Sequence, residues 1–136
     1  MDIQLISIDP LTRVASLKLS SKFVSGIHKL IQIVILSLLN TPGRDLLDPD
    51  RGAGIPEMIG MNYDSSNMVE ILGEITRRVK ISEKEIMTDQ IGLNLPPAEK
   101  LQELKVISVS PGATLGEVKA RIRIINELGQ QSEVVM

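Results

Sequence analysis

The sequence lacks cysteine and tryptophan and has almost no other aromatic residue. Among its 136 residues, Phe23 and Tyr63 are the only aromatic side chains. The absence of cysteine excludes disulfides, thiolate metal sites and cysteine nucleophiles. Proteins that stack bases or sugar rings use aromatic platforms, so the composition disfavours such ligands. The core is therefore expected to consist of aliphatic side chains and Met, within a hydrophobic fraction of 43%.

Histidine and excess charge are also scarce. The single histidine, His28, excludes any site that needs two, and a net charge of −2 gives no basic field for nucleic acid. The longest apolar stretch, residues 30–39, is interrupted by Gln32 and Ser37 and is shorter than the roughly 20 residues that span a bilayer. Residues 1–4 show no secretory-signal pattern. We therefore expect a soluble cytoplasmic product that binds neither nucleic acid nor membrane.

The length corresponds to one domain. A chain of 136 residues and 14.9 kDa leaves little room for a second core. We expect residues 1–136 to form a single domain. Residues 1–22 are expected to form an N-terminal β extension of two short strands, separated by a turn at Asp9 and Pro10.

Two segments have apolar residues at helical spacing. Residues 24–40 are apolar on almost every side, which predicts a helix buried on more than one face, with Ser25 as N-cap and Gly43 as stop signal. Residues 66–90 are amphipathic and end before Gly92. The expected apolar face of this second helix comprises Met68, Leu72, Ile75, Val79 and Ile86.

Three extended segments follow the second helix. Residues 104–109 form the first and residues 132–136 the last, which follows a turn at residues 128–130. The clearest strand lies between them, where Val118, Ala120, Ile122 and Ile124 alternate with Lys119, Arg121 and Arg123. This basic row predicts a solvated sheet face, with an acidic protein partner as the alternative.

The last strand is expected to lie at an edge of the sheet. Val134 and Val135 end the chain, and an uncovered edge presents unpaired N–H and C=O groups. Such an edge suits the addition of a strand from another protein. The alternative is a strand that lies inside the sheet or frays.

Residues 41–64, between the helices, cannot form a regular element. They hold three of the seven prolines and four of the ten glycines. A loop of this length is usually functional when it is ordered. We expect residues 41–55 to be ordered and to contact neighbouring chains.

Acidic residues gather in and near this loop without forming a recognised site. Asp48, Asp50 and Gly52 match only part of a calcium-binding loop, because the later acidic ligand of the pattern is missing and Gly52 is at the wrong place. No serine lies in a nucleophile-turn motif. A glycoside hydrolase would need two carboxylates facing one cleft, which sequence spacing does not indicate. We therefore expect no catalytic residue, no metal site and no cofactor.

The end of the first helix and the following loop carry a family resemblance. The two runs are Leu38-Leu39-Asn40-Thr41-Pro42-Gly43-Arg44 and Asp48-Pro49-Asp50-Arg51-Gly52-Ala53-Gly54-Ile55. Together they resemble the baseplate wedge family of contractile phage tails. This family includes the phage W protein, the T-even baseplate wedge subunit and the small baseplate component of type VI secretion. In the order of its elements, the resemblance covers residues 20–136.

The resemblance implies both a fold and a function. It implies a small α+β domain without a cofactor, in which two main helices pack on a small, mostly antiparallel sheet. Members are structural proteins that surround the tail tube, bind other wedge proteins and template the first sheath ring. For this chain it implies a virion protein of the tail baseplate, made in the host bacterial cytoplasm. The expected partners are other wedge proteins, the tail sheath protein and the tail tube, with several copies in a symmetric ring.

The resemblance also implies a docking residue. Many members carry a Glu-Pro-Arg motif that docks to the wedge core. Glu99 matches its glutamate, whereas Lys100 and Leu101 stand where the proline and arginine would be. The complete expected partner-binding set is Thr41, Pro42, Gly43, Arg44, Asp48, Pro49, Asp50, Gly52, Gly54, Glu99, Lys119, Arg121, Arg123, Val134 and Val135.

Two other functions remain as alternatives. One is a tail hydrolase that degrades peptidoglycan, although the sequence offers no aromatic platform for sugar rings. The other is a cellular adaptor whose long apolar helix packs into a partner bundle.

Overall fold

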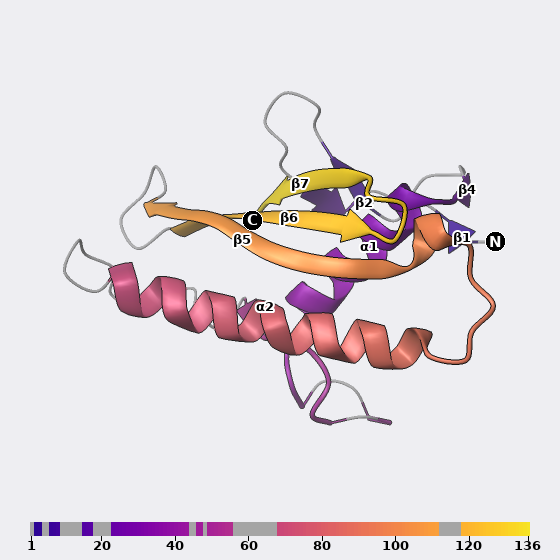
Figure 1. The fold of residues 1–136 in the computed structure, drawn as a ribbon. Helices are drawn as coiled ribbons and strands as arrows, with labels where there is room; N and C mark the ends of the chain where they lie inside the picture. Colours follow the sequence, from indigo (N-terminus) through magenta and orange to yellow (C-terminus); the bar gives the residue numbers. More distant parts are fainter. Residues whose placement is uncertain are drawn as a thin grey trace.

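The computed structural model describes residues 2–3, 6–8, 15–17, 23–43, 46–47, 49–55, 68–111 and 118–136. Two α-helices and a three-stranded antiparallel sheet make up most of this part of the chain (Figure 1). The fold is therefore α+β, as the resemblance implied.

The first helix, α1 (Ile27–Leu39), presents one wide apolar stripe to the core. Its buried residues are Leu30, Ile31, Gln32, Val34, Ile35 and Leu38. Leu36 and Leu39, on the opposite side, remain 39% and 36% exposed. The expected burial on more than one face therefore does not extend to these two leucines. Ser25 is not the N-cap, because Gly26 occupies that position. The N-cap residue makes no side-chain hydrogen bond to the helix.

The second helix, α2 (Met68–Gln90), is amphipathic as expected, but its buried face begins differently. The buried residues are Ile71, Ile75, Val79, Ser82 and Ile86. Leu72, which the sequence placed on this face, is 41% exposed, because Ile71 lies directly one turn before Ile75. The Ser82 hydroxyl lies 2.9 Å from that of Ser37 and joins the two helices through a buried polar contact.

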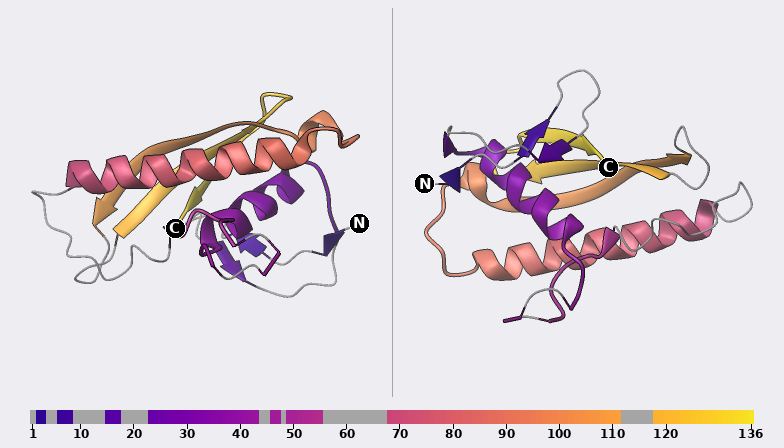
Figure 2. Two further views of the ribbon diagram at one scale, coloured as in Figure 1. Left: turned by 90° about the horizontal axis from the view of Figure 1, so that it is seen from below. Right: turned by 180° about the vertical axis from the view of Figure 1, so that it is seen from behind.

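The sheet consists of β5 (Leu101–Pro111), β6 (Val118–Asn126) and β7 (Gln131–Val135), in the order β5-β6-β7. All three expected strands are present, although β5 begins earlier and ends later than residues 104–109. Both helices lie on the same face of the sheet (Figure 2). The side chains that meet them include Leu104, Ala120, Ile122, Ile124 and Val134, all buried in one apolar cluster with the helix residues.

The N-terminal part contains more strands than the two that the sequence predicted. β1 (Asp2–Ile3) pairs with β4 (Phe23–Val24), and β2 (Ile6–Ile8) pairs with β3 (Ala15–Leu17). Both pairs are antiparallel. The expected turn at Asp9 and Pro10 lies outside the described residues.

Candidate functional site

Residues 51–54 of the loop between the helices are bound to the end of α1. The last carbonyl groups of a helix have no partner within it. Here the N–H of Ala53 donates to the carbonyl of Ser37 at 3.2 Å, and that of Gly54 donates to Asn40 at 2.9 Å. The Asn40 side chain donates to the carbonyl of Arg51 at 3.2 Å. Residues 51–54 therefore follow the end of α1 as an ordered strap.

Gly52 is required by the close approach of this strap to the helix. Its φ is +112°, and a Cβ at this position would lie 2.3 Å from the carbonyl oxygen of Asn40. Its N–H donates to the Glu85 carboxylate of α2 at 3.3 Å. Gly52 and Gly54 are both buried. Of the expected partner-binding residues, these two thus serve contacts within the chain.

α2 holds the strap from its other side. Arg78 donates to the carbonyl oxygens of Gly54 at 2.6 Å and Ala53 at 3.1 Å. Its Nε also donates to Glu74 at 2.7 Å. Arg51 forms an ion pair with Asp89. The strap therefore joins both helices, which explains why a segment rich in glycine is ordered.

Most of the described loop residues before the strap face outward. Pro42, Gly43, Pro49 and Asp50 are exposed, and Thr41 is half-buried. The N–H of Gly43 donates to the Pro49 carbonyl at 2.6 Å, which draws the two ends of this part together. Leu46 and Leu47, which the sequence reasoning did not single out, are 94% and 97% exposed. Arg44 and Asp48, both expected to bind partners, lie outside the described residues.

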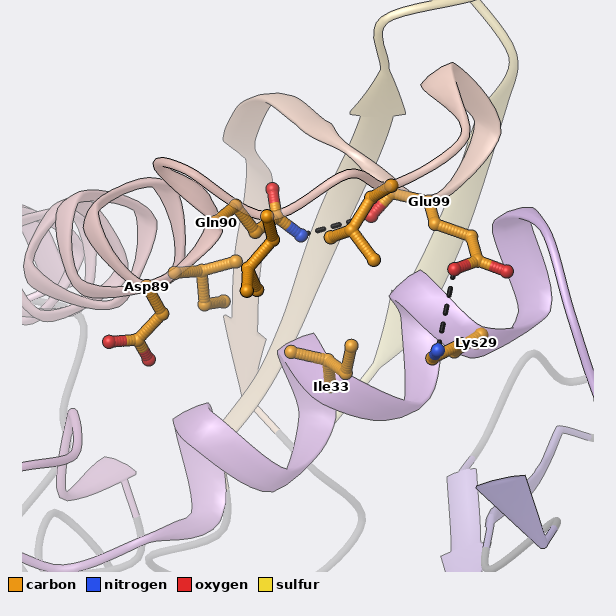
Figure 3. A pocket seen from close by; sticks show the side chains of 8 residues that line it. Lys29, Ile33, Asp89, Gln90 and Glu99 are labelled. Carbon is orange, nitrogen blue, oxygen red and sulfur yellow. Dashed lines mark hydrogen bonds and ion pairs between the residues drawn. The ribbon is translucent and has the colours of Figure 1, made fainter. Parts of the chain in front are cut away.

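Glu99 is engaged inside the chain. It lies in the short 3-10 helix η2 (Pro97–Glu99) and is 9% exposed. One carboxylate oxygen accepts the N–H of Gly26 at 3.2 Å, and the other lies 3.3 Å from the Lys29 ammonium (Figure 3). Gln90 donates to the Glu99 carbonyl at 2.9 Å. Glu99 therefore accepts the N–H of the N-cap residue itself, at the helix end where Ser25 was expected to act as N-cap.

A small apolar pocket opens beside Glu99, between the two helices (Figure 3). Its volume is about 250 Å³, and Ile33, Ile86, Leu93 and Leu95 line it together with the polar residues Lys29, Asp89, Gln90 and Glu99. Ligand pockets usually measure roughly 300–1,000 Å³ and contain convergent polar groups. The polar groups here bond to each other, to Arg51 or to the backbone of Leu101.

The basic row lies on the face of the sheet away from the helices. Lys119 and Arg121 are exposed, while Ala120, Ile122 and Ile124 are buried. This alternation of buried and exposed residues is the one that the sequence predicted. Glu133 of β7 accepts from Arg123 at 2.8 Å, and its other oxygen lies 4.0 Å from Arg121.

The two edges of the sheet differ in how they are covered. At the β5 edge, α2 supplies side-chain partners for the strand backbone. Glu83 accepts the N–H of Leu104 at 2.6 Å, and Lys80 donates to the carbonyl of Leu104 at 3.1 Å. Gln90 accepts the N–H of Leu101 at 2.9 Å. These contacts block part of this edge to another strand.

At the β7 edge, no described side chain bonds to the backbone of Gln131 or Val135. Ala120 and Met136 exchange two backbone hydrogen bonds of 2.9 Å, so they form a hydrogen-bonded pair. Such pairs alternate along an antiparallel ladder. In the observed register, the backbone of Val134 therefore points toward β6, whereas the backbones of Gln131 and Val135 point away from it. No described strand pairs with that outer side.

The two valines of this strand are placed differently from one another. Val134 is 1% exposed and belongs to the core, whereas Val135 is half-buried on the outer side of the sheet. Val134 thus anchors β7, and Val135 is the residue that an added strand would meet.

Other kinds of site are not found among the described residues. No group of His, Asp or Glu side chains there could hold a metal ion, and none of the described helices is both long and apolar enough to cross a membrane. His28 is exposed on α1. Comparisons of the chain with protein families, with curated proteins and with solved structures give no match.

Proposed function

We propose that this chain is a structural subunit of the baseplate wedge of a contractile tail. It links the wedge to the tail tube and sheath, and it templates the first sheath ring by accepting a strand of the sheath protein at β7. In this account it belongs to the virion, is made in the host bacterial cytoplasm, occurs in several copies around a symmetric ring and has no enzymatic activity.

The difference between the two sheet edges carries the proposal. Exposed edges promote unwanted pairing, and proteins normally cover or blunt them. Three α2 side chains, Lys80, Glu83 and Gln90, occupy backbone groups of β5. No described side chain occupies the outward backbone groups of Gln131 and Val135 in β7. An edge that is left open beside one that is blocked suits the addition of one strand at a defined place.

The loop supports a second contact, with other wedge proteins. Its strap at residues 51–54 is fixed to both helices, so the exposed residues Pro49 and Asp50 extend from a rigid base. A segment that is ordered before binding loses less conformational entropy when it binds. In the proposed assembly the Glu99 carboxylate does not itself bind a wedge protein, because it bonds within the chain and positions the start of α1. A docking role would act through the surface that α1 and η2 form.

Val135→Pro tests the strand-addition role. The N–H of Val135 points away from β6, so proline removes an outward donor and keeps the pairing with β6. We expect baseplates to assemble with this variant but to carry no polymerised sheath. Val135→Thr keeps the N–H and serves as the matched control, with normal tails expected. Full-length sheath on the proline variant would contradict the proposal.

A further inference from the structure

We propose that the strand added to β7 carries an acidic side chain opposite Val135 and an uncharged or basic side chain opposite Glu133. This inference rests on the proposed strand addition and specifies the chemistry of the partner. It follows from the register of β7 and from the charges on the outer face of the sheet.

The register fixes which partner residues reach that face. The described sheet is antiparallel throughout, and an added strand is taken to continue this pattern. Directly opposed residues in antiparallel strands project to the same face. Glu133 and Val135 project to the outer face, because the intervening Val134 is buried with the core. Partner residues opposite Glu133 and Val135 therefore also lie on the outer face.

The outer face is predominantly basic. Its charged side chains on the three strands are Glu103, Lys105, Lys119, Arg121, Arg123 and Glu133. Arg123 is the better satisfied of the two arginines, since it lies 2.8 Å from Glu133 and its side chain is 33% exposed. Arg121 lies at 4.0 Å from the same carboxylate and is 52% exposed. Compared with Arg123, Arg121 thus has more of its guanidinium available to pair with a carboxylate of the added strand.

Arg121 also lies at the right place in the register. It is paired with Val135, so an added residue opposite Val135 continues the same row across the sheet. Adjacent strands lie about 4.8 Å apart, which puts that residue roughly 10 Å from Arg121 at the backbone. Valine is short, and the long side chains of arginine and glutamate can meet across it. Arginine also has a planar fork of donors that matches a carboxylate.

The position opposite Glu133 has the reverse preference. An acidic residue there would face a like charge directly across the strand pair, which is destabilising. The partner strand is therefore expected to alternate apolar residues on its inner face with outer-face residues of which only the one opposite Val135 is acidic.

Synthetic peptides test this with the full chain. The probe is acetylated and amidated Glu-Val-Thr-Val-Thr, whose glutamate falls opposite Val135 in the antiparallel register. Its counterpart has lysine in place of glutamate. Binding is followed by NMR at the backbone amides of Gln131 and Val135. We expect the glutamate peptide to bind up to about fivefold more tightly, which is the range of one cross-strand charge pair.

Two matched pairs of variants assign the site. The third peptide residue lies opposite Glu133, so its N–H points toward β7 and methylating this nitrogen removes a donor to that strand. The N–H of the fourth residue points away from β7, so methylating it alters only the outer edge of the peptide. Only the first methylation should therefore abolish binding. Arg121→Gln should remove the preference for glutamate. Lys105→Gln, a charge on the same face but on β5, should leave that preference unchanged.

The possible results distinguish the proposed strand addition from the preference for an acidic residue opposite Val135. Binding at β7 without a preference for glutamate, or a preference that survives Arg121→Gln, would overturn this inference and leave strand addition standing. Absence of binding by either peptide at Gln131 and Val135 would overturn strand addition, and this inference with it.

Discussion

The carboxylate of Glu83 in α2 accepts the backbone N–H of Leu104 in β5 at 2.6 Å. The same helix also supplies Lys80 to the Leu104 carbonyl. A helix side chain therefore takes the place that a neighbouring strand would otherwise occupy. This contact occupies backbone groups at the β5 edge of the sheet, whereas no described side chain bonds to the backbone of Gln131 or Val135 at the β7 edge.

Removing this contact should open the β5 edge. Glu83→Ala leaves the N–H of the buried Leu104 without an acceptor, which costs about 1–3 kcal/mol of unfolding free energy. We expect a lower urea midpoint and increased light scattering, since a second edge becomes available for pairing. Glu83→Gln retains an acceptor and serves as the control. Equal stability and solubility of the alanine variant and the wild type would refute the covering role.

Gly52 should be intolerant of a side chain. A Cβ there would meet the Asn40 carbonyl at 2.3 Å, and the φ of +112° disfavours every other residue. We expect Gly52→Ala to lower the unfolding free energy by about 1–3 kcal/mol. Gly73 in α2 is the matched control, because a Cβ there meets nothing within 4 Å. Gly73→Ala should raise stability by up to about 1 kcal/mol. Similar effects of the two substitutions in urea denaturation would contradict the assigned strap geometry.

Glu99 should stabilise the start of α1. Glu99→Ala removes the acceptor of the Gly26 N–H and the partner of the Lys29 ammonium. We expect a loss of about 1–3 kcal/mol in unfolding free energy and faster hydrogen exchange at Gly26. Glu99→Gln retains an acceptor oxygen and should lose less. Unchanged exchange at Gly26 in the alanine variant would show that the cap is not formed in solution.

The Glu74 cluster should make stability depend on pH in acid. Hydrogen bonds from Arg77 and Arg78 lower the pKa of Glu74 from 4.5 to about 2. A carboxyl with a lowered pKa in the folded state binds its proton more readily when unfolded. Its stabilisation is therefore complete above pH 4.5 and is lost as the pH falls toward 2.

Glu74→Gln provides the measurement for this cluster. The difference in unfolding free energy between wild type and variant should be largest near neutral pH and should shrink between about pH 5 and 2. A difference that stays constant over this range would show that the Glu74 pKa is not lowered. Glu70→Gln, on the exposed first turn of the same helix, is the control for a general loss of charge.

The sequence was most informative where local periodicity decides the structure. The alternation from Val118 to Ile124 predicted β6, and the residues at helical spacing predicted both helices. Within α2, the prediction that Leu72 lies on the buried face was wrong, and Ile71 is buried instead. Both residues are apolar, so the packing of neighbouring elements decides which one is buried.

Contacts between distant residues could not be predicted in this way. The cap of α1 comes from Glu99, 73 residues after Gly26, so local cap chemistry pointed to Ser25 instead. The burial of Gly52 and Gly54 likewise depends on both helices closing around the loop. The sequence predicted partner contacts for residues 41–55 but not that residues 52–54 are buried within the chain. The position of β7 at an edge of the three-stranded sheet was predicted, whereas the covering of β5 by α2 was not.

The proposed acceptance of a sheath strand by β7 in a contractile-tail baseplate can be seen in a cryo-electron microscopy map of assembled tails in which this chain is located by a fused tag. We expect a sheath strand that is hydrogen-bonded to Gln131 and Val135 on the outer side of β7. A map in which this edge faces solvent, or tails in which the tag is absent from the baseplate, would contradict it.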